Sequence, residues 1–143
     1  MTPEEILSYP AKILTQEQRE HYFEYGYVGI EDFVPSDILK LIKLVTSEFV
    51  EKSRDVTESN NVFDIGPGHS CESPVLRRLK SPDENHQEYW NFSKGLMADV
   101  ASDLVGPNVT FHHSKLNFSG TTEATLLNGI RIFNSFLIQI TTF

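Results

Sequence analysis

An apolar stripe between residues 36 and 49 constrains the fold more than any other feature of this sequence. Its side chains recur at helical spacing and form one face, made of Ile38, Leu39, Leu41, Ile42, Val45 and Phe49. Ser36 is a natural helix cap and Asp37 complements the helix dipole, so we expect a helix to open there. The stripe predicts that this helix packs on a core, with Ile38 and Leu41 among its buried residues.

A shorter helix is expected before it, over residues 15–25. Thr15 and Gln18 have the spacing of a capping box, in which each side chain bonds the backbone of the other. Gly26 follows as the residue that most easily takes the left-handed conformation ending a helix.

Strand patterns gather later in the chain, at residues 27–30, 62–64, 75–79 and 109–118. Two further short helices are expected at 83–94 and 95–104. Because helices come first and strands collect afterwards, the order indicates an α+β fold rather than an alternating α/β fold.

Composition excludes several classes of protein. The chain has 143 residues, enough for one domain with a core, and a net charge of -8 that disfavours nucleic acids and anionic membranes as partners. The single cysteine, Cys71, excludes an internal disulfide and fits a reducing compartment. No basic stretch leads into an apolar run at the start, and polar residues interrupt the apolar segment after residue 125. We therefore expect a cytoplasmic protein without a signal peptide or membrane span.

Six short motifs follow one another between residues 14 and 117. They read LTQEQ from Leu14, YGYV from Tyr25, FVPSDI from Phe33, LRRLKSP from Leu76, DLVGPN from Asp103 and FHHSKLN from Phe111. In this order and spacing they resemble the N-terminal half of the phytanoyl-CoA dioxygenase family of iron- and 2-oxoglutarate-dependent oxygenases. The resemblance covers residues 14 to about 125. It implies N-terminal helices packed outside the first strands of a double-stranded β-helix, or jelly roll, which is incomplete here.

The resemblance also implies a cosubstrate site. Family members hold Fe(II) with two histidines and one carboxylate, and a basic residue neutralises the far carboxylate of 2-oxoglutarate. By resemblance a basic residue near Arg78 reaches the cosubstrate, and Ser114 matches a position near it. His112 would share the Ser114 face of the predicted strand, so Arg78, His112 and Ser114 are the candidate cosubstrate-binding residues.

Each candidate has a structural alternative. Arg78 can be a surface arginine, with Arg77 on the other side of its strand. His112 and His113 point to opposite faces of a strand, so one can be an ordinary inward residue with a satisfied hydrogen bond. His69 is interpreted as a loop residue, and Cys71 lacks a basic cluster that would activate it.

The iron ligands of the family are missing from this chain. They begin with a His-x-Asp triplet soon after the strand expected to end near Phe118, but none of the five histidines has an aspartate two residues later, and the one His-x-Glu triplet, at His86, lies well before that strand. One permitted set of codons for residues 125–143, with a single base inserted after codon 125, reads Thr-Pro-Val-Lys-Trp-His-Gln-Asp. We therefore interpret residues 1–125 as the family domain and residues 126–143 as a frameshifted tail. The alternative is a natural divergent C-terminus, with strand character at residues 130–140.

The predicted function is that of a dioxygenase fragment. The complete enzyme would hydroxylate a small organic substrate and convert 2-oxoglutarate to succinate, using Fe(II). The chain itself is expected to be inactive and to bind neither cofactor, and we assign it no catalytic or metal-ligating residue. The alternative is a non-enzymatic acidic α+β binding or interaction domain. In addition, an open sheet edge and an apolar tail predict self-association.

Overall fold

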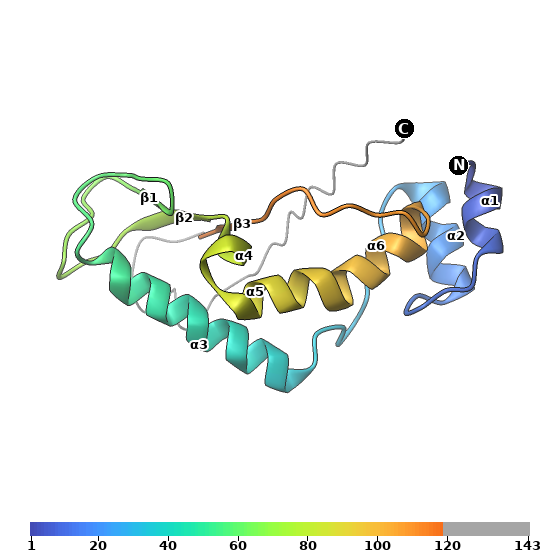
Figure 1. Ribbon diagram of the computed structural model, residues 1–143, viewed down its shortest axis with the longest axis horizontal. Helices are drawn as coiled ribbons and strands as arrows, with labels where there is room; N and C mark the ends of the chain where they lie inside the picture. The colour runs from blue at the N-terminus through green and yellow to red at the C-terminus, as the bar shows by residue number, and fades with distance from the viewer. Residues whose placement is uncertain (119–143) are drawn as a thin grey trace. The chain divides into compact units, whose positions relative to one another are not determined.

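The computed structural model describes residues 1–118, which form helices and a small antiparallel sheet (Figure 1). The chain divides into two compact units. Among residues 1–118, the first contains Met1–Pro35 and Asn91–His112, and the second contains Ser36–Trp90 and residues 113–118. The mixture of helix and sheet confirms the α+β class. The predicted tail at 126–143 and its boundary lie outside the described residues.

The first unit is helical. It contains α1 (Pro3–Ser8), α2 (Gln16–Tyr25), the π-helical turn η1 (Ser93–Met97) and α6 (Ala98–Val105). Thr15 and Gln18 form the predicted capping box at the start of α2. Gly26 ends the helix with a φ of 80°, and its N–H donates to the Tyr22 carbonyl at 2.8 Å. The predicted helix over residues 15–25 is therefore confirmed, including both of its ends.

Helices α1, α2 and α6 pack together around a small core (Figure 1). Its apolar members are Ile6, Leu14, Val100 and Ala101. Two charged side chains, Arg19 and Asp103, are buried in the same unit with only 2% of their surface exposed. Burial of charges in so small a core requires that hydrogen bonds satisfy them, as described below.

The predicted pair of helices at 83–94 and 95–104 is present but more divided. It consists of α4 (Pro82–Asn85), α5 (Gln87–Phe92), η1 and α6. The extended backbone of His86, with a φ of −155°, separates α4 from α5. Gly95 leaves helical geometry, with φ −92° and ψ −110°, close to the boundary that the sequence predicts.

The second unit combines a long helix with the sheet. Helix α3 (Ser36–Ser53) lies against β2 (Leu76–Lys80), the central strand (Figure 1). Strands β1 (Phe63–Ile65) and β3 (Lys115–Asn117) pair with it on either side, both antiparallel, in the order β1-β2-β3. Phe63 is opposite Leu79, which is opposite Leu116, and a register shift follows at Asp64/Ile65. The predicted strands at 62–64 and 75–79 are thus confirmed to within a residue.

The core of the second unit lies between α3 and the sheet. Buried side chains come from both, namely Ile42, Val45, Phe49, Phe63, Leu76, Leu79 and Leu116. Tyr89 of α5 joins them through its hydroxyl, which lies 2.5 Å from Thr46 Oγ1. Burial raises the pKa of Tyr89, and the bond to Thr46 opposes part of that rise. The phenol therefore remains neutral and acts as a fixed hydrogen-bonding group in the core.

The buried face of α3 differs from the predicted one. Leu41 is 39% exposed and Ile38 is half-buried, whereas Thr46 and Ser53 are buried. The hydroxyls of these two residues bond carbonyls of their own helix, Thr46 to Ile42 at 2.6 Å and Ser53 to Val50 at 2.7 Å. Because the hydroxyls are satisfied within the helix, small polar residues can face the core, and the buried stripe is offset from the most apolar one.

Two strand predictions are wrong. Residues 27–30 are irregular, and Tyr27 is 64% exposed. The strand predicted over residues 109–118 is confined to Lys115–Asn117. Residues 27–30 and 109–113 contain β-forming side chains, but no strand of residues 1–118 pairs with them, and pairing is what stabilises a strand.

Candidate functional site

One face of the sheet in the second unit gathers polar and basic side chains. Asp64 is opposite Arg78, which is opposite Asn117, and Lys80 is opposite Lys115 on the same face. All five residues, here called the basic sheet face, are half-buried. Phe63, Leu79 and Leu116 alternate with them and are buried on the opposite face. The strand period therefore separates a packed face from a charged one.

Arg78 is held at the centre of the basic sheet face. Its Nε donates to Asn117 Oδ1 at 3.2 Å, which fixes the plane of the guanidinium and leaves its remaining N–H groups for other acceptors. Lys80 Nζ donates to the Asn60 carbonyl at 2.7 Å, at the side of the same strand. With three cations and one acid, the face has the charge that a carboxylate ligand requires. Arg77, which precedes Arg78 on β2, is exposed.

Ser114 lies just before β3, on the packed side of the sheet. Its carbonyl accepts from the Ser81 N–H at 3.1 Å, and its buried hydroxyl donates to Asp83 Oδ1 in a short hydrogen bond. Ser114 is buried like Leu116, which lies on the face opposite Arg78. The structure therefore does not bring Arg78 and Ser114 together; it joins Arg78 to Asn117 and Ser114 to Asp83.

His112 does not share a face with Ser114, contrary to the prediction. Residues two positions apart share a face only in a regular strand, and residues 111–114 are irregular. His112 and His113 are both exposed, whereas Ser114 is 6% exposed. His112 also belongs to the first compact unit and Ser114 to the second.

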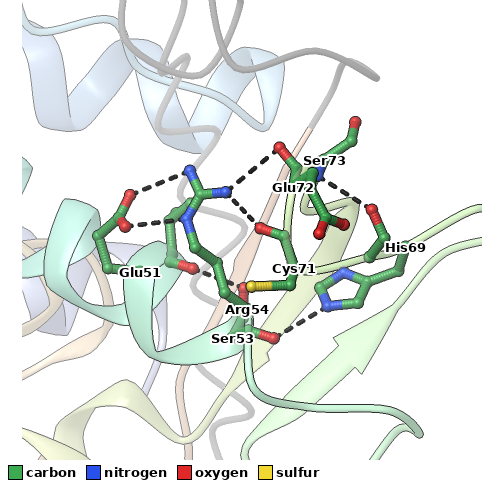
Figure 2. A network of polar contacts seen from close by, with 9 residues as sticks. Glu51, Ser53, Arg54, His69, Cys71, Glu72 and Ser73 are labelled. Carbon is green, nitrogen blue, oxygen red and sulfur yellow. Dashed lines mark hydrogen bonds and ion pairs between the residues drawn. The ribbon is translucent and has the colours of Figure 1, made fainter.

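His69 is a loop residue, as the sequence predicts, and its ring ties the loop to α3. Nε2 lies 2.9 Å from the Ser53 carbonyl (Figure 2). Nδ1 accepts from the Val75 N–H at 2.9 Å. This pair of contacts requires that Nε2 carries the proton in the neutral ring. Because backbone groups occupy both nitrogens, His69 has a structural role.

Arg54 completes the same attachment. Its guanidinium bonds the Glu51 carboxylate at 2.8 and 3.3 Å, and it donates to the Cys71 carbonyl at 2.6 Å (Figure 2). The side chains at the end of α3 therefore hold the loop between β1 and β2 through its backbone. Cys71 is exposed and contributes its carbonyl to this network.

A second polar network, in the first unit, was not predicted from the sequence. The Asp103 carboxylate accepts the backbone N–H groups of Lys12, Ile13 and Leu14 at 2.8, 2.8 and 2.9 Å. Arg19 Nε donates to the Asp103 carbonyl at 2.9 Å, and the same guanidinium bonds the carbonyls of Tyr9 and Ile6. Both side chains anchor the N-terminal segment to α6.

The electrostatics of Asp103 agree with this anchoring role. Burial by itself raises the pKa of the carboxyl group, but the three N–H donors and the charge of Arg19 outweigh burial and lower it. The carboxylate is therefore ionised at neutral pH and acts as an acceptor. Such a group stabilises a fold and is not a proton donor.

The residues of the described part do not fit an iron centre. No group of three or more His, Cys, Asp or Glu side chains within residues 1–118 could hold a metal ion. Nor is any helix of that part long and apolar enough to cross a membrane. No protein-family model, curated protein or solved structure is significantly similar to the chain.

Proposed function

We propose that this chain is the N-terminal part of an Fe(II)- and 2-oxoglutarate-dependent oxygenase of the phytanoyl-CoA dioxygenase type. The complete enzyme hydroxylates a small organic substrate and converts 2-oxoglutarate to succinate. In this proposal the three-stranded sheet is the beginning of a jelly roll whose remaining strands are not formed by residues 1–118. The observation that carries the proposal is the order of six family-like motifs along residues 14–117.

The places of these motifs in the structure support the proposal. YGYV includes the left-handed Gly26 that ends α2, and FVPSDI runs into the start of α3. LRRLK coincides with β2, and Pro82 follows as the first residue of α4. DLVGPN contains the end of α6, where Gly106 has a φ of 103°. These four motifs therefore each include an element boundary, where a sequence signature has a structural reason.

Arg78 is the residue that we assign to the far carboxylate of 2-oxoglutarate. Support comes from its central position on the basic sheet face and from the excess of positive charge there. Asn117 orients the guanidinium through the bond from Nε. His112 and Ser114 remain predictions that rest on the resemblance.

The chain itself is proposed to be inactive, since residues 1–118 supply no facial triad. The alternative function, a non-enzymatic acidic binding domain, differs in one clear respect. It does not require that a single inserted base after codon 125 restores a His-x-Asp triplet.

The test starts from the gene. Sequencing across codon 125 should reveal an adjacent frame that encodes the triplet, and the restored full-length protein should form succinate from 2-oxoglutarate when supplied with Fe(II). The present chain, assayed beside it, should give succinate at the blank level. Absence of the triplet from both other frames would reject the proposal in favour of the binding domain.

Variants of the restored enzyme test the site. Arg78→Met should weaken 2-oxoglutarate binding by at least about tenfold, since a charged hydrogen bond contributes about 1.5–3 kcal/mol. Arg77→Met is the matched control, because Arg77 is the exposed neighbour on the same strand and should change the affinity little. Equal effects of the two substitutions would remove Arg78 from the site.

A further inference from the structure

Three rings gather on the surface of the first unit at the end of α2. The imidazole of His21 lies 4.6 Å from the ring of Tyr25 and 5.0 Å from that of Tyr27, measured between centroids. Tyr25 is 57% exposed and Tyr27 is 64% exposed. In this aromatic patch, formed by His21, Tyr25 and Tyr27, the imidazole contacts both tyrosine rings, and both tyrosines remain largely exposed.

Local sequence explains why the rings meet. His21 and Tyr25 are four residues apart in α2, so they are neighbours on the helix surface. Gly26 then takes the left-handed conformation and turns the chain, which places Tyr27 edge-on to His21, with an interplanar angle of 88°. The aromatic patch therefore depends on the end of α2. The motif YGYV supplies both the glycine that turns the chain and the two tyrosines of the patch.

Acidic residues lie beside the aromatic patch. Glu17, Glu20 and Glu24 follow one another at helical spacing on α2, and all three are exposed. These three residues are here called the acidic stripe. They extend for about 10 Å along the helix axis, at 1.5 Å per residue. Residues 1–35 contain seven acids but only two basic residues, Lys12 and Arg19.

Neither basic residue neutralises the acidic stripe. Lys12 Nζ bonds Asp99 at 2.9 Å, and Arg19 is buried, with its guanidinium on the carbonyls of Ile6, Tyr9 and Asp103. The described contact of Glu20 is with a neutral group, the amide of Gln16 at 3.0 Å. The stripe therefore presents carboxylates next to the electron-rich faces of two tyrosines.

We propose that the aromatic patch and the acidic stripe together bind an arginine-rich segment of a partner protein. A guanidinium can stack on a tyrosine face while it bonds a carboxylate with two parallel N–H groups, which an ammonium cannot do. Carboxylates spread along about two turns of helix match successive side chains of a peptide better than one small cation. This interaction is independent of the proposed oxygenase function, because it uses residues 17–27 alone.

Calorimetric titration of the full chain with a synthetic peptide of alternating arginine and glycine tests the proposal. Saturable binding is expected, and it should weaken with added salt. Tyr25→Ala and Tyr27→Ala should each weaken it about two- to fivefold, the range for an exposed cation–π contact. The corresponding Phe substitutions should retain it, because they keep the ring. A double change of Glu20→Gln and Glu24→Gln should also weaken binding.

Matched controls make the result decisive. Tyr9→Ala removes a tyrosine that is 47% exposed in the same unit but outside the patch, and Glu4→Gln removes an exposed acid of α1. Neither should change the affinity. The proposal is overturned if the peptide does not bind saturably, if the controls weaken binding as much as the patch variants do, or if tetramethylammonium binds as tightly as the peptide.

Discussion

Asp103 and Arg19 are the residues on which the helical unit depends most. Asp103 accepts three backbone N–H groups that precede α2, and the one from Leu14 is buried, where an unpaired donor would be costly. Arg19 takes three carbonyls, from Ile6, Tyr9 and Asp103 itself. The two side chains thus supply hydrogen-bond partners for backbone groups that have none in a helix or sheet.

Replacing Asp103 by Asn should therefore destabilise the first unit by about 2–4 kcal/mol, because an amide presents one oxygen and an N–H₂ group to three donors. The pH dependence follows from the lowered pKa of Asp103. Its contribution should be complete above the unfolded value, about 3.9, and should be lost as pH falls through the lower folded value. Urea unfolding at several pH values, with hydrogen exchange of the Lys12, Ile13 and Leu14 amides, measures both effects.

Asp99→Asn is the matched control for this prediction. Asp99 lies one turn earlier on α6 and bonds Lys12 Nζ at 2.9 Å, but both side chains are about half exposed, at 41% and 53%. An ion pair of this kind contributes less than about 1 kcal/mol. Equal losses in the two variants, or an unchanged acid dependence in Asp103→Asn, would contradict the role given to Asp103.

Sequence predicts the local contacts at this scale and misses the distant ones. The Thr15–Gln18 capping box and the Gly26 stop involve residues within one helix, so their spacing is visible in the sequence. The bond from Lys12 to Asp103 joins residues 91 positions apart. No local pattern records such a pairing, and an arginine within α2 looks like any surface residue until its burial is known.

At the scale of elements, the same contrast separates helices from strands. Helix α3 begins at Ser36, within a residue of the start that the sequence predicts, because a helix satisfies its own backbone. Strand β3 contains three of the ten residues predicted, since a strand extends only where a neighbour pairs with it. His112 and Ser114 lie outside β3. For this reason they do not share a face, as the sequence predicted they would.

Helix α3 offers a sharp test of which face is buried. Ile42 is 4% exposed and its neighbour Leu41 is 39% exposed. Ile42→Asp should cost at least about 4 kcal/mol, because it removes buried apolar volume and introduces an unpaired charge. Leu41→Asp should cost less than about 1 kcal/mol, although sequence periodicity ranks it as a core position.

Thermal unfolding followed by circular dichroism distinguishes the two α3 variants. A large loss of stability in Leu41→Asp would show that Leu41 lies on the buried face of α3, as periodicity predicts. It would also imply that another part of the protein covers Leu41. A small loss in Ile42→Asp would contradict the packing of α3 on β2.

At the scale of the whole molecule, the two edge strands of the sheet bear on association between chains. Strands β1 and β3 are the edges of the three-stranded sheet within residues 1–118, and edge strands expose backbone groups that can pair with another chain. A jelly roll would cover them with later strands. The sequence beyond residue 125 instead contains many apolar residues and no acid. This composition favours association between chains.

A chain that ends at Thr125 tests whether residues 126–143 belong to the native fold. If residues 126–143 are a frameshift product, they were never selected to pack on this fold. Their removal should then change the Tm by less than about 2 °C, the lower end of the shift expected from losing 1 kcal/mol in a domain of about 150 residues. Removal should also reduce association, because it deletes an apolar segment and leaves the acidic charge of residues 1–125 unchanged.

Light scattering and thermal unfolding of the two chains, at equal concentration, measure these effects. The apolar tail should make the full chain associate more strongly with increasing concentration, whereas the shortened chain should remain closer to a monomer. A full chain that is monomeric, and a shortened chain that unfolds, would instead assign residues 126–143 to the native fold. That result would favour the divergent acidic binding domain over the dioxygenase fragment, because a tail that stabilises the protein must have been selected together with it.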